Sequence, residues 1–96
     1  MFVILLKFSE HKHRAKDFMA EHNAWIKQGI ENDVFILAGS LQPQAGGCII
    51  AHNIDRTDLE QLIAQDPFVK QKVVFAEIFE VNPSIANEKF SDFLTA

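Results

Sequence analysis

Two side chains in this sequence have the types and the setting that acid–base chemistry requires. His22 lies at helical spacing from Phe18 and Trp25, on a face that is otherwise apolar, where a histidine needs a polar partner. Asp66 is the candidate partner, because Pro67 stops an amphipathic run and so holds the carboxylate at a fixed corner. In such a pair the carboxylate orients the imidazole, and the second ring nitrogen transfers a proton near neutral pH.

The first interpretation of the pair is an enzyme with His22 as general acid or base and Asp66 as its orienting partner. The sequence offers no evident nucleophile, because Cys48 lies inside a predicted strand and Ser40 lies in a turn without an elbow motif. The chemistry indicated is therefore proton transfer, meaning isomerisation, elimination or hydration of a small substrate.

The second interpretation is a non-catalytic ligand-binding or dimerisation module. In it, His22 and Asp66 form a buried hydrogen-bonded pair that locks two helices together. The access of the His22–Asp66 pair to solvent distinguishes the two interpretations. A pair that lines a solvent-connected pocket favours chemistry, and a pair sealed under Trp25 and Phe68 favours a structural role.

Four further residues are assigned to substrate binding around the pair. Trp25 and Phe68 are the aromatic neighbours of the two candidates in sequence. Gly39 and Ser40 end a predicted strand, where a glycine lets another group approach the backbone closely. The simpler role for Gly39 and Ser40 is the exit of a hairpin.

No metal or cofactor is expected. The sequence contains four histidines, and in an extended segment His11 and His13 would point to one side, but no cysteine or acidic cluster completes a ligand set. No glycine motif of the type that cradles phosphates is present. The short basic cluster at residues 11–14 would instead attract an anionic substrate.

Length and composition predict one globular domain over residues 1–96. The chain is 48% hydrophobic and 23% charged, with a net charge of -4 and scattered basic residues, which argues against nucleic acid or an anionic membrane as partner. The apolar run at residues 2–6 is too short for a transmembrane span and lacks the features of a signal peptide. The single thiol of Cys48, expected to be buried, favours the cytoplasm, and the expected partner is a small-molecule ligand.

The hydrophobic pattern predicts four strands, at residues 2–8, 33–41, 47–52 and 72–81. Helices are predicted at residues 15–28, with Gly29 as a left-handed C-cap, and at residues 53–65, where Thr57 and Glu60 have capping-box spacing. Residues 84–96 form either a short terminal helix or an extended arm.

The order strand, helix, strand, strand, helix, strand predicts an α+β fold of the ferredoxin-like split βαβ type. Its four-stranded antiparallel sheet carries both helices on one face. The strands are apolar on the other face too, so we expect a second subunit to cover it, giving a homodimeric α+β barrel. The alternative cover is the chain's own terminal segment with Phe90, Phe93 and Leu94.

Short motifs along nearly the whole chain resemble those of the YCII-related domain family, also called YciI-like proteins. They are an N-terminal strand like Phe2-Val3-Ile4-Leu5, the helical stretch His22-Asn23-Ala24-Trp25-Ile26, the strand Ile36-Leu37-Ala38-Gly39, the motif Asp66-Pro67-Phe68-Val69, and Asn82-Pro83 after the closing strand. The resemblance implies a dimeric α+β barrel and a His–Asp dyad on His22 and Asp66. Some relatives are tied to the turnover of small aromatic or enolic compounds.

Two departures from this family limit what the resemblance implies. Many relatives carry an arginine one helical turn before the histidine, where this chain has Met19, so an anion-binding role of that arginine is not carried over. The loop at residues 41–47 is also short, so substrate identity is not transferred.

Overall fold

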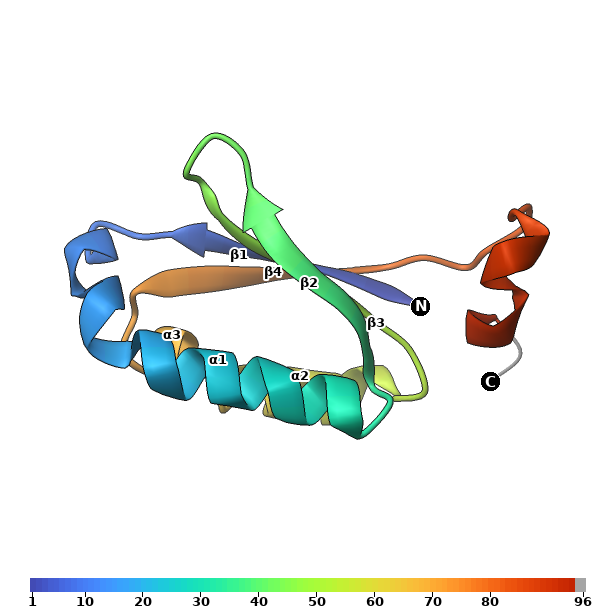
Figure 1. Cartoon of the computed structure of the whole chain (residues 1–96), viewed down its shortest axis with the longest axis horizontal. Coiled ribbons are helices and arrows are strands. Elements are labelled where there is room, and N and C mark those ends of the chain that lie inside the picture. The colour runs from blue at the N-terminus through green and yellow to red at the C-terminus, as the bar shows by residue number, and fades with distance from the viewer. Residues whose placement is uncertain (95–96) are drawn as a thin grey trace.

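The computed structural model describes residues 1–94 and contains four strands and three α-helices. The strands are β1 (Phe2–Phe8), β2 (Phe35–Leu41), β3 (Gly46–Ala51) and β4 (Val74–Glu80), and the α-helices are α1 (Ala15–Glu31), α2 (Arg56–Ala64) and α3 (Pro67–Lys70). Two short 3-10 helices, η1 (Lys12–Arg14) and η2 (Glu88–Phe93), complete the described chain. The predicted order of strands and long helices is confirmed, and α1, α2 and α3 lie on one face of the sheet (Figure 1).

The strands form one antiparallel sheet in the order β2-β3-β1-β4. The first strand, β1, is central: Leu6 is opposite Gly47 of β3 on one side and Ala76 of β4 on the other. This topology is the predicted ferredoxin-like α+β arrangement.

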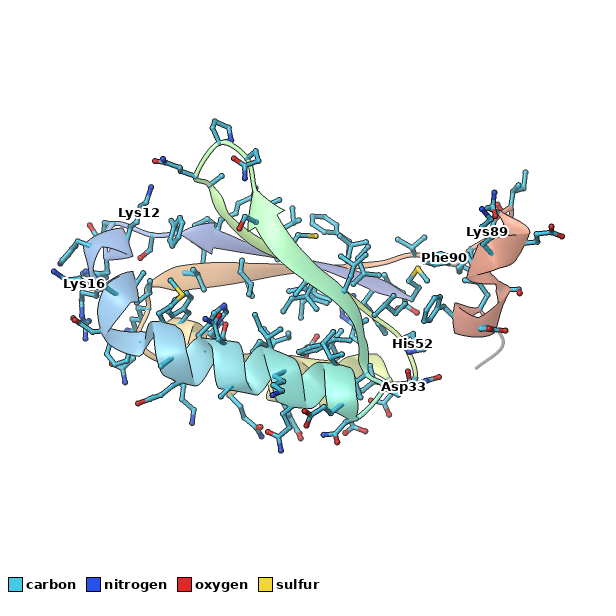
Figure 2. The ribbon with its side chains drawn as sticks, viewed as in Figure 1. Lys12, Lys16, Asp33, His52, Lys89 and Phe90 are labelled. Atoms are coloured by element: carbon cyan, nitrogen blue, oxygen red, sulfur yellow. The ribbon has the colours of Figure 1, made fainter. Side chains whose placement is uncertain are left out.

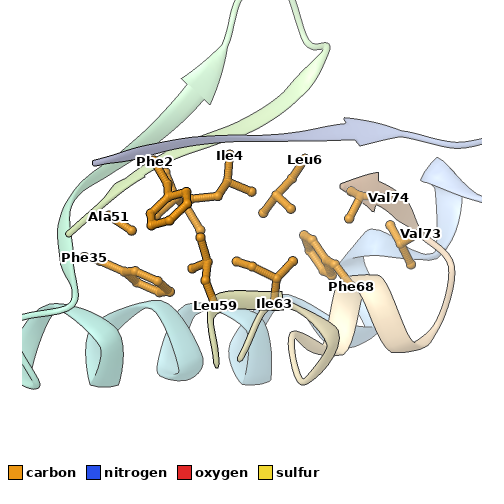
Figure 3. Close-up of a cluster of buried hydrophobic side chains, with 11 residues drawn as sticks. Phe2, Ile4, Leu6, Phe35, Ala51, Leu59, Ile63, Phe68, Val73 and Val74 are labelled. Atoms are coloured by element: carbon orange, nitrogen blue, oxygen red, sulfur yellow. The ribbon is translucent and has the colours of Figure 1, made fainter. Parts of the chain in front are cut away.

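The hydrophobic core fills the space between the sheet and the helices (Figure 3). Every second residue of β1 is buried, which follows from the two-residue period of a strand. Leu59 and Ile63 of α2 and Phe68 of α3 pack against these side chains from the opposite layer. The main buried side chains are Phe2, Ile4, Leu6, Phe35, Ile49, Leu59, Ile63, Phe68, Val73 and Val74.

The other face of the sheet is apolar and open. Phe75 and Phe79 of β4 remain 51% and 49% exposed, and Cys48, which was expected to be buried, is only half-buried. The terminal segment does not cover this face. Instead, η2 lies beyond the end of the sheet (Figure 1), where the ring of Phe93 contacts His52 at a centroid distance of 5.6 Å.

The predicted end of the first helix is wrong. Helix α1 continues to Glu31, and Gly29 is a buried interior residue rather than a C-cap. A Cβ atom on Gly29 would lie 2.2 Å from the Phe35 ring, so glycine is required for close packing between α1 and β2. The left-handed backbone after the helix belongs to Asp33, with φ of 58°.

The predicted start of the second helix also needs correction, whereas its end at Ala64 lies within one residue of the prediction. Helix α2 begins at Arg56 with Asp55 as N-cap, whose carboxylate accepts the Asp58 N–H at 2.8 Å, so the Thr57 capping box is not formed. The chain does not pass directly into a strand after Pro67. Proline is favourable at the first position of a helix, and here it starts α3.

Candidate active site

The structure brings His22 and Asp66 together. His22 lies in the middle of α1 and Asp66 in the turn between α2 and α3, and His22 Nδ1 is 2.7 Å from Asp66 Oδ1. Asp66 is fully buried, and the same oxygen accepts the Phe68 backbone N–H at 3.0 Å, so the carboxylate is also the N-cap of α3. The helix that follows the aspartate therefore fixes the position of the carboxylate.

Aromatic side chains fix the plane of the imidazole. The Phe68 ring stacks on His22 with centroids 3.9 Å apart and planes only 6° from parallel. The Trp25 ring lies at 6.2 Å from His22 and packs its other side against Phe35 at 5.1 Å. With one ring edge bonded to Asp66 and one face covered by Phe68, the imidazole has a single orientation.

The hydrogen bond to Asp66 also fixes the tautomer of neutral His22. A carboxylate can only accept, so Nδ1 carries the hydrogen and Nε2 carries the lone pair. Within residues 1–94, the buried side-chain nitrogens and oxygens without a partner are Trp25 Nε1 and Asp66 Oδ2. His22 Nε2 makes no protein hydrogen bond there and is not one of these buried atoms, so this nitrogen remains in contact with solvent.

A cavity of about 350 Å³ lies on the solvent side of His22. It forms between α1 and the β2–β3 hairpin, which diverges from the helix layer toward its tip (Figure 1). Of the residues assigned to the site from sequence, His22, Gly39, Ser40 and Phe68 line this cavity. Trp25 and Asp66 do not line it and instead support His22 from within the protein.

Sequence reasoning missed three cavity residues on α1. Met19, Asn23 and Ile26 line the cavity together with His22. Met19 and Ile26 lie three and four residues from the histidine, and Asn23 lies four residues after Met19. This spacing was the available signal, because positions three or four residues apart share a helix face. Asn23 adds an amide to a lining that is otherwise mostly apolar.

A β-bulge explains why Ser40 faces the cavity. The β2–β3 register shifts between Phe35 and Leu37, so the inward positions of β2 after the bulge are Ala38 and Ser40. Ala38 is opposite the buried Ile49, which places it on the helix side of the sheet. Without the bulge, the two-residue period of the strand would turn Ser40 to the opposite face.

The other histidines lie apart from this cavity. His52 Nε2 is 3.2 Å from Asp33 Oδ1, and its Nδ1 is 3.4 Å from the Phe93 carbonyl oxygen. The part of the chain that the structure describes contains no group of three or more His, Cys, Asp or Glu side chains arranged to hold a metal ion. In the same part, no helix is long and apolar enough to span a membrane.

Comparison with known proteins gives the family. The sequence profile of the YCII-related domain matches residues 1–82. The chain belongs to the YCII-related domain family. A search of curated proteins found no match.

Among solved structures, this chain is similar to that of 5-chloro-2-hydroxyhydroquinone dehydrochlorinase (TftG) from Burkholderia phenoliruptrix, determined in complex with 2,5-dihydroxybenzoquinone. The TM-score is 0.73 with 15% sequence identity, and the match covers 86% of this chain and 94% of that chain. At this identity the similarity shows the fold alone, which is the ferredoxin-like α+β fold.

Proposed function

We propose that this protein is an enzyme that transfers a proton on a small enolic or aromatic metabolite, with His22 as general acid or base and Asp66 as its orienting partner. The observation that carries the proposal is the geometry of His22. One ring nitrogen is bonded at 2.7 Å to a fully buried carboxylate, and the other reaches solvent beside a cavity of about 350 Å³. A merely structural pair would not need the second nitrogen to stay accessible.

The proposed reaction begins with neutral His22. Its Nε2 takes a proton from a hydroxyl, or from a carbon next to a carbonyl, and Asp66 stabilises the imidazolium that forms. In an elimination, the electron pair left on the substrate expels a leaving group. In an isomerisation, the proton returns to another carbon. The neighbour TftG is named as a dehydrochlorinase of a small hydroquinone, which is chemistry of this type on the same fold.

The open sheet face supports a homodimer as part of this proposal. Phe75 and Phe79 of β4 project about half-exposed from one edge of it, and Leu37 of β2, at the opposite edge of the sheet, is 44% exposed. A second copy packed face to face would bury these side chains and form the α+β barrel. A cytoplasmic location remains a prediction that rests on the single cysteine.

Proton exchange tests the proposed activity directly. The wild-type protein is mixed with a panel of small enolic and hydroxyquinol compounds in D₂O, and deuterium incorporation is followed by NMR. We expect His22→Gln to lower the exchange rate about 100-fold or more, because a positioned acid–base group contributes roughly 100- to 10,000-fold.

Met19→Leu is the matched control, because it keeps an apolar side chain of similar volume on the same cavity wall. It should retain most of the exchange activity. Equal exchange rates for wild type and His22→Gln would refute the catalytic role. They would favour the alternative, a ligand-binding or dimerisation module in which Asp66 ties α1 to α3.

A further inference from the structure

A second hollow adjoins the His22 cavity and contains a lysine. This hollow has a volume of about 330 Å³ and shares Phe8, Ser40 and Gly46 with the His22 cavity. Lys12 of η1 lines the second hollow. The three shared residues place the two hollows side by side, and we refer to them together as the joined hollows.

The Lys12 ammonium is positioned but not neutralised. Its Nζ donates to the Gln44 carbonyl oxygen at 3.1 Å and lies 4.9 Å from the centroid of the Phe8 ring. Among residues 1–94, the lysine that pairs with a carboxylate is Lys7, with Glu77 at 2.6 Å, and Lys12 has no such partner. An ammonium has three N–H donors, so two remain for a ligand.

The joined hollows have a positive lining in a chain of net charge -4. None of the residues that line either hollow is aspartate or glutamate, and the ionisable ones are His22 and Lys12. Asp66 lies behind His22, where its Oδ1 is committed to the ring and to the Phe68 N–H. A concave site lined by one sign of charge attracts ligands of the opposite sign.

We propose that Lys12 binds the negatively charged oxygen of the substrate, and that the joined hollows accept a small planar anion such as an enolate or a carboxylate. This inference rests on the proposed function. Proton removal by His22 leaves negative charge on the substrate, and an ammonium already in place stabilises that charge without reorganisation. Ser40, which lines both hollows, presents a hydroxyl that can donate to the same group.

The test measures binding rather than turnover. The probe is 2,5-dihydroxybenzoquinone, whose acidic enol groups ionise in neutral water, and the uncharged comparison is its dimethyl ether. Dissociation constants are measured for wild type, Lys12→Met, Lys12→Arg and Lys16→Met. Lys16 is the matched control, because it lies nearby at the start of α1 (Figure 2) and lines neither hollow.

We expect the anion to bind wild type more tightly than the ether. Lys12→Met should weaken anion binding about five- to tenfold, since a charge-assisted hydrogen bond at a partly exposed site is lost. The dissociation constants of Lys12→Arg and Lys16→Met for the anion should stay within about twofold of the wild-type value. Added salt should narrow the difference in anion affinity between wild type and Lys12→Met.

Three outcomes would overturn the inference. Lys12→Met and Lys16→Met could weaken anion binding equally, the ether could bind as tightly as the anion, or the anion could fail to bind. The same measurement on His22→Gln separates the two proposals. If anion binding by the His22→Gln protein still depends on Lys12, the anion site is supported. If wild type at the same time shows no proton exchange, the proposed catalysis alone fails.

Discussion

The substitution Asp66→Asn removes the charge of the carboxylate and keeps its oxygen as a hydrogen-bond acceptor for His22 and Phe68. Asparagine has nearly the same volume, and its carbonyl oxygen can still accept the Phe68 N–H, which keeps the N-cap of α3. The same oxygen lies 2.7 Å from His22 Nδ1, so it also continues to accept the Nδ1–H, and the amide nitrogen takes the place of Oδ2. The tautomer with the hydrogen on Nδ1 is therefore kept, and Nε2 keeps its lone pair. What the variant removes is the negative charge that stabilises the imidazolium formed on proton transfer.

The free energy of unfolding should change little, because two effects oppose each other. The variant loses a charge-assisted hydrogen bond, which contributes about 1.5–3 kcal/mol. It also replaces the fully buried, charged Oδ2, which has no partner within the described chain, with an uncharged amide nitrogen, and burying a neutral polar atom costs less than burying a charged one. We therefore expect a net change within about 1 kcal/mol. Proton exchange should nevertheless fall roughly tenfold, because a charge-assisted hydrogen bond to the imidazolium exceeds a neutral one by about 1–1.5 kcal/mol.

Two measurements check this prediction. Denaturant unfolding gives the free energy, and NMR of the ring nitrogens gives the His22 tautomer in wild type and variant. Asp66→Ala is the control, because it removes both the cap and the ring partner and should cost about 3–5 kcal/mol. An Asp66→Asn protein that exchanges protons as fast as wild type in the D₂O assay, that moves the His22 hydrogen to Nε2, or that loses as much stability as Asp66→Ala, would refute the reasoning.

Three further predictions concern the scaffold. Gly29→Ala should lower the free energy of unfolding by roughly 1–2 kcal/mol, because overpacking against Phe35 outweighs the better helix propensity of alanine. Gly39→Ala is the control, because its Cβ position is open, and it should change the free energy of unfolding by less than about 0.5 kcal/mol. Denaturant titrations measure both values. Phe79→Lys should yield a folded monomer in sedimentation experiments where wild type sediments as a dimer, and a variant that still dimerises would show that the open face is not the interface. A chain ending at Val81 should keep its fold by circular dichroism. Its free energy of unfolding should fall by about 1 kcal/mol, since it lacks the Phe93 carbonyl that lies 3.4 Å from His52 Nδ1. Unfolding of this shorter chain would contradict the interpretation of residues 1–82, which the family profile matches, as the folded domain.

The elements and the central pair were predictable because their signals are local. Alternation along β1 and helical spacing around His22 are both visible in short windows of sequence. The pairing of His22 with Asp66 spans 44 positions, yet it could be inferred from one buried histidine that needs a partner and one carboxylate held by a proline.

The features that sequence did not predict depend on contacts between distant segments. Gly29 follows the last apolar turn as a C-cap would, and only the Phe35 ring beneath it shows that it is an interior packing position. The bulge in β2 that turns Ser40 into the cavity is a property of the pairing with β3. Lys12 reaches the cavity region through the Gln44 carbonyl, 32 positions away, so its place beside the site is a tertiary feature.

The central position of β1 determines when the site can form during synthesis. Strand β1 leaves the ribosome first, but its two neighbours, β3 and β4, are residues 46–51 and 74–80. The first strand therefore has no sheet partner until residues 46–51 have been translated, and its second edge has none until residues 74–80 have. Asp66 and its helix emerge just before β4, so sheet closure and assembly of the His–Asp pair fall within the same late stage of translation. An arrested chain that stops before β4 would carry the histidine and an apolar strand with one unpaired edge, and would expose the surface on which misfolding and chaperone binding act.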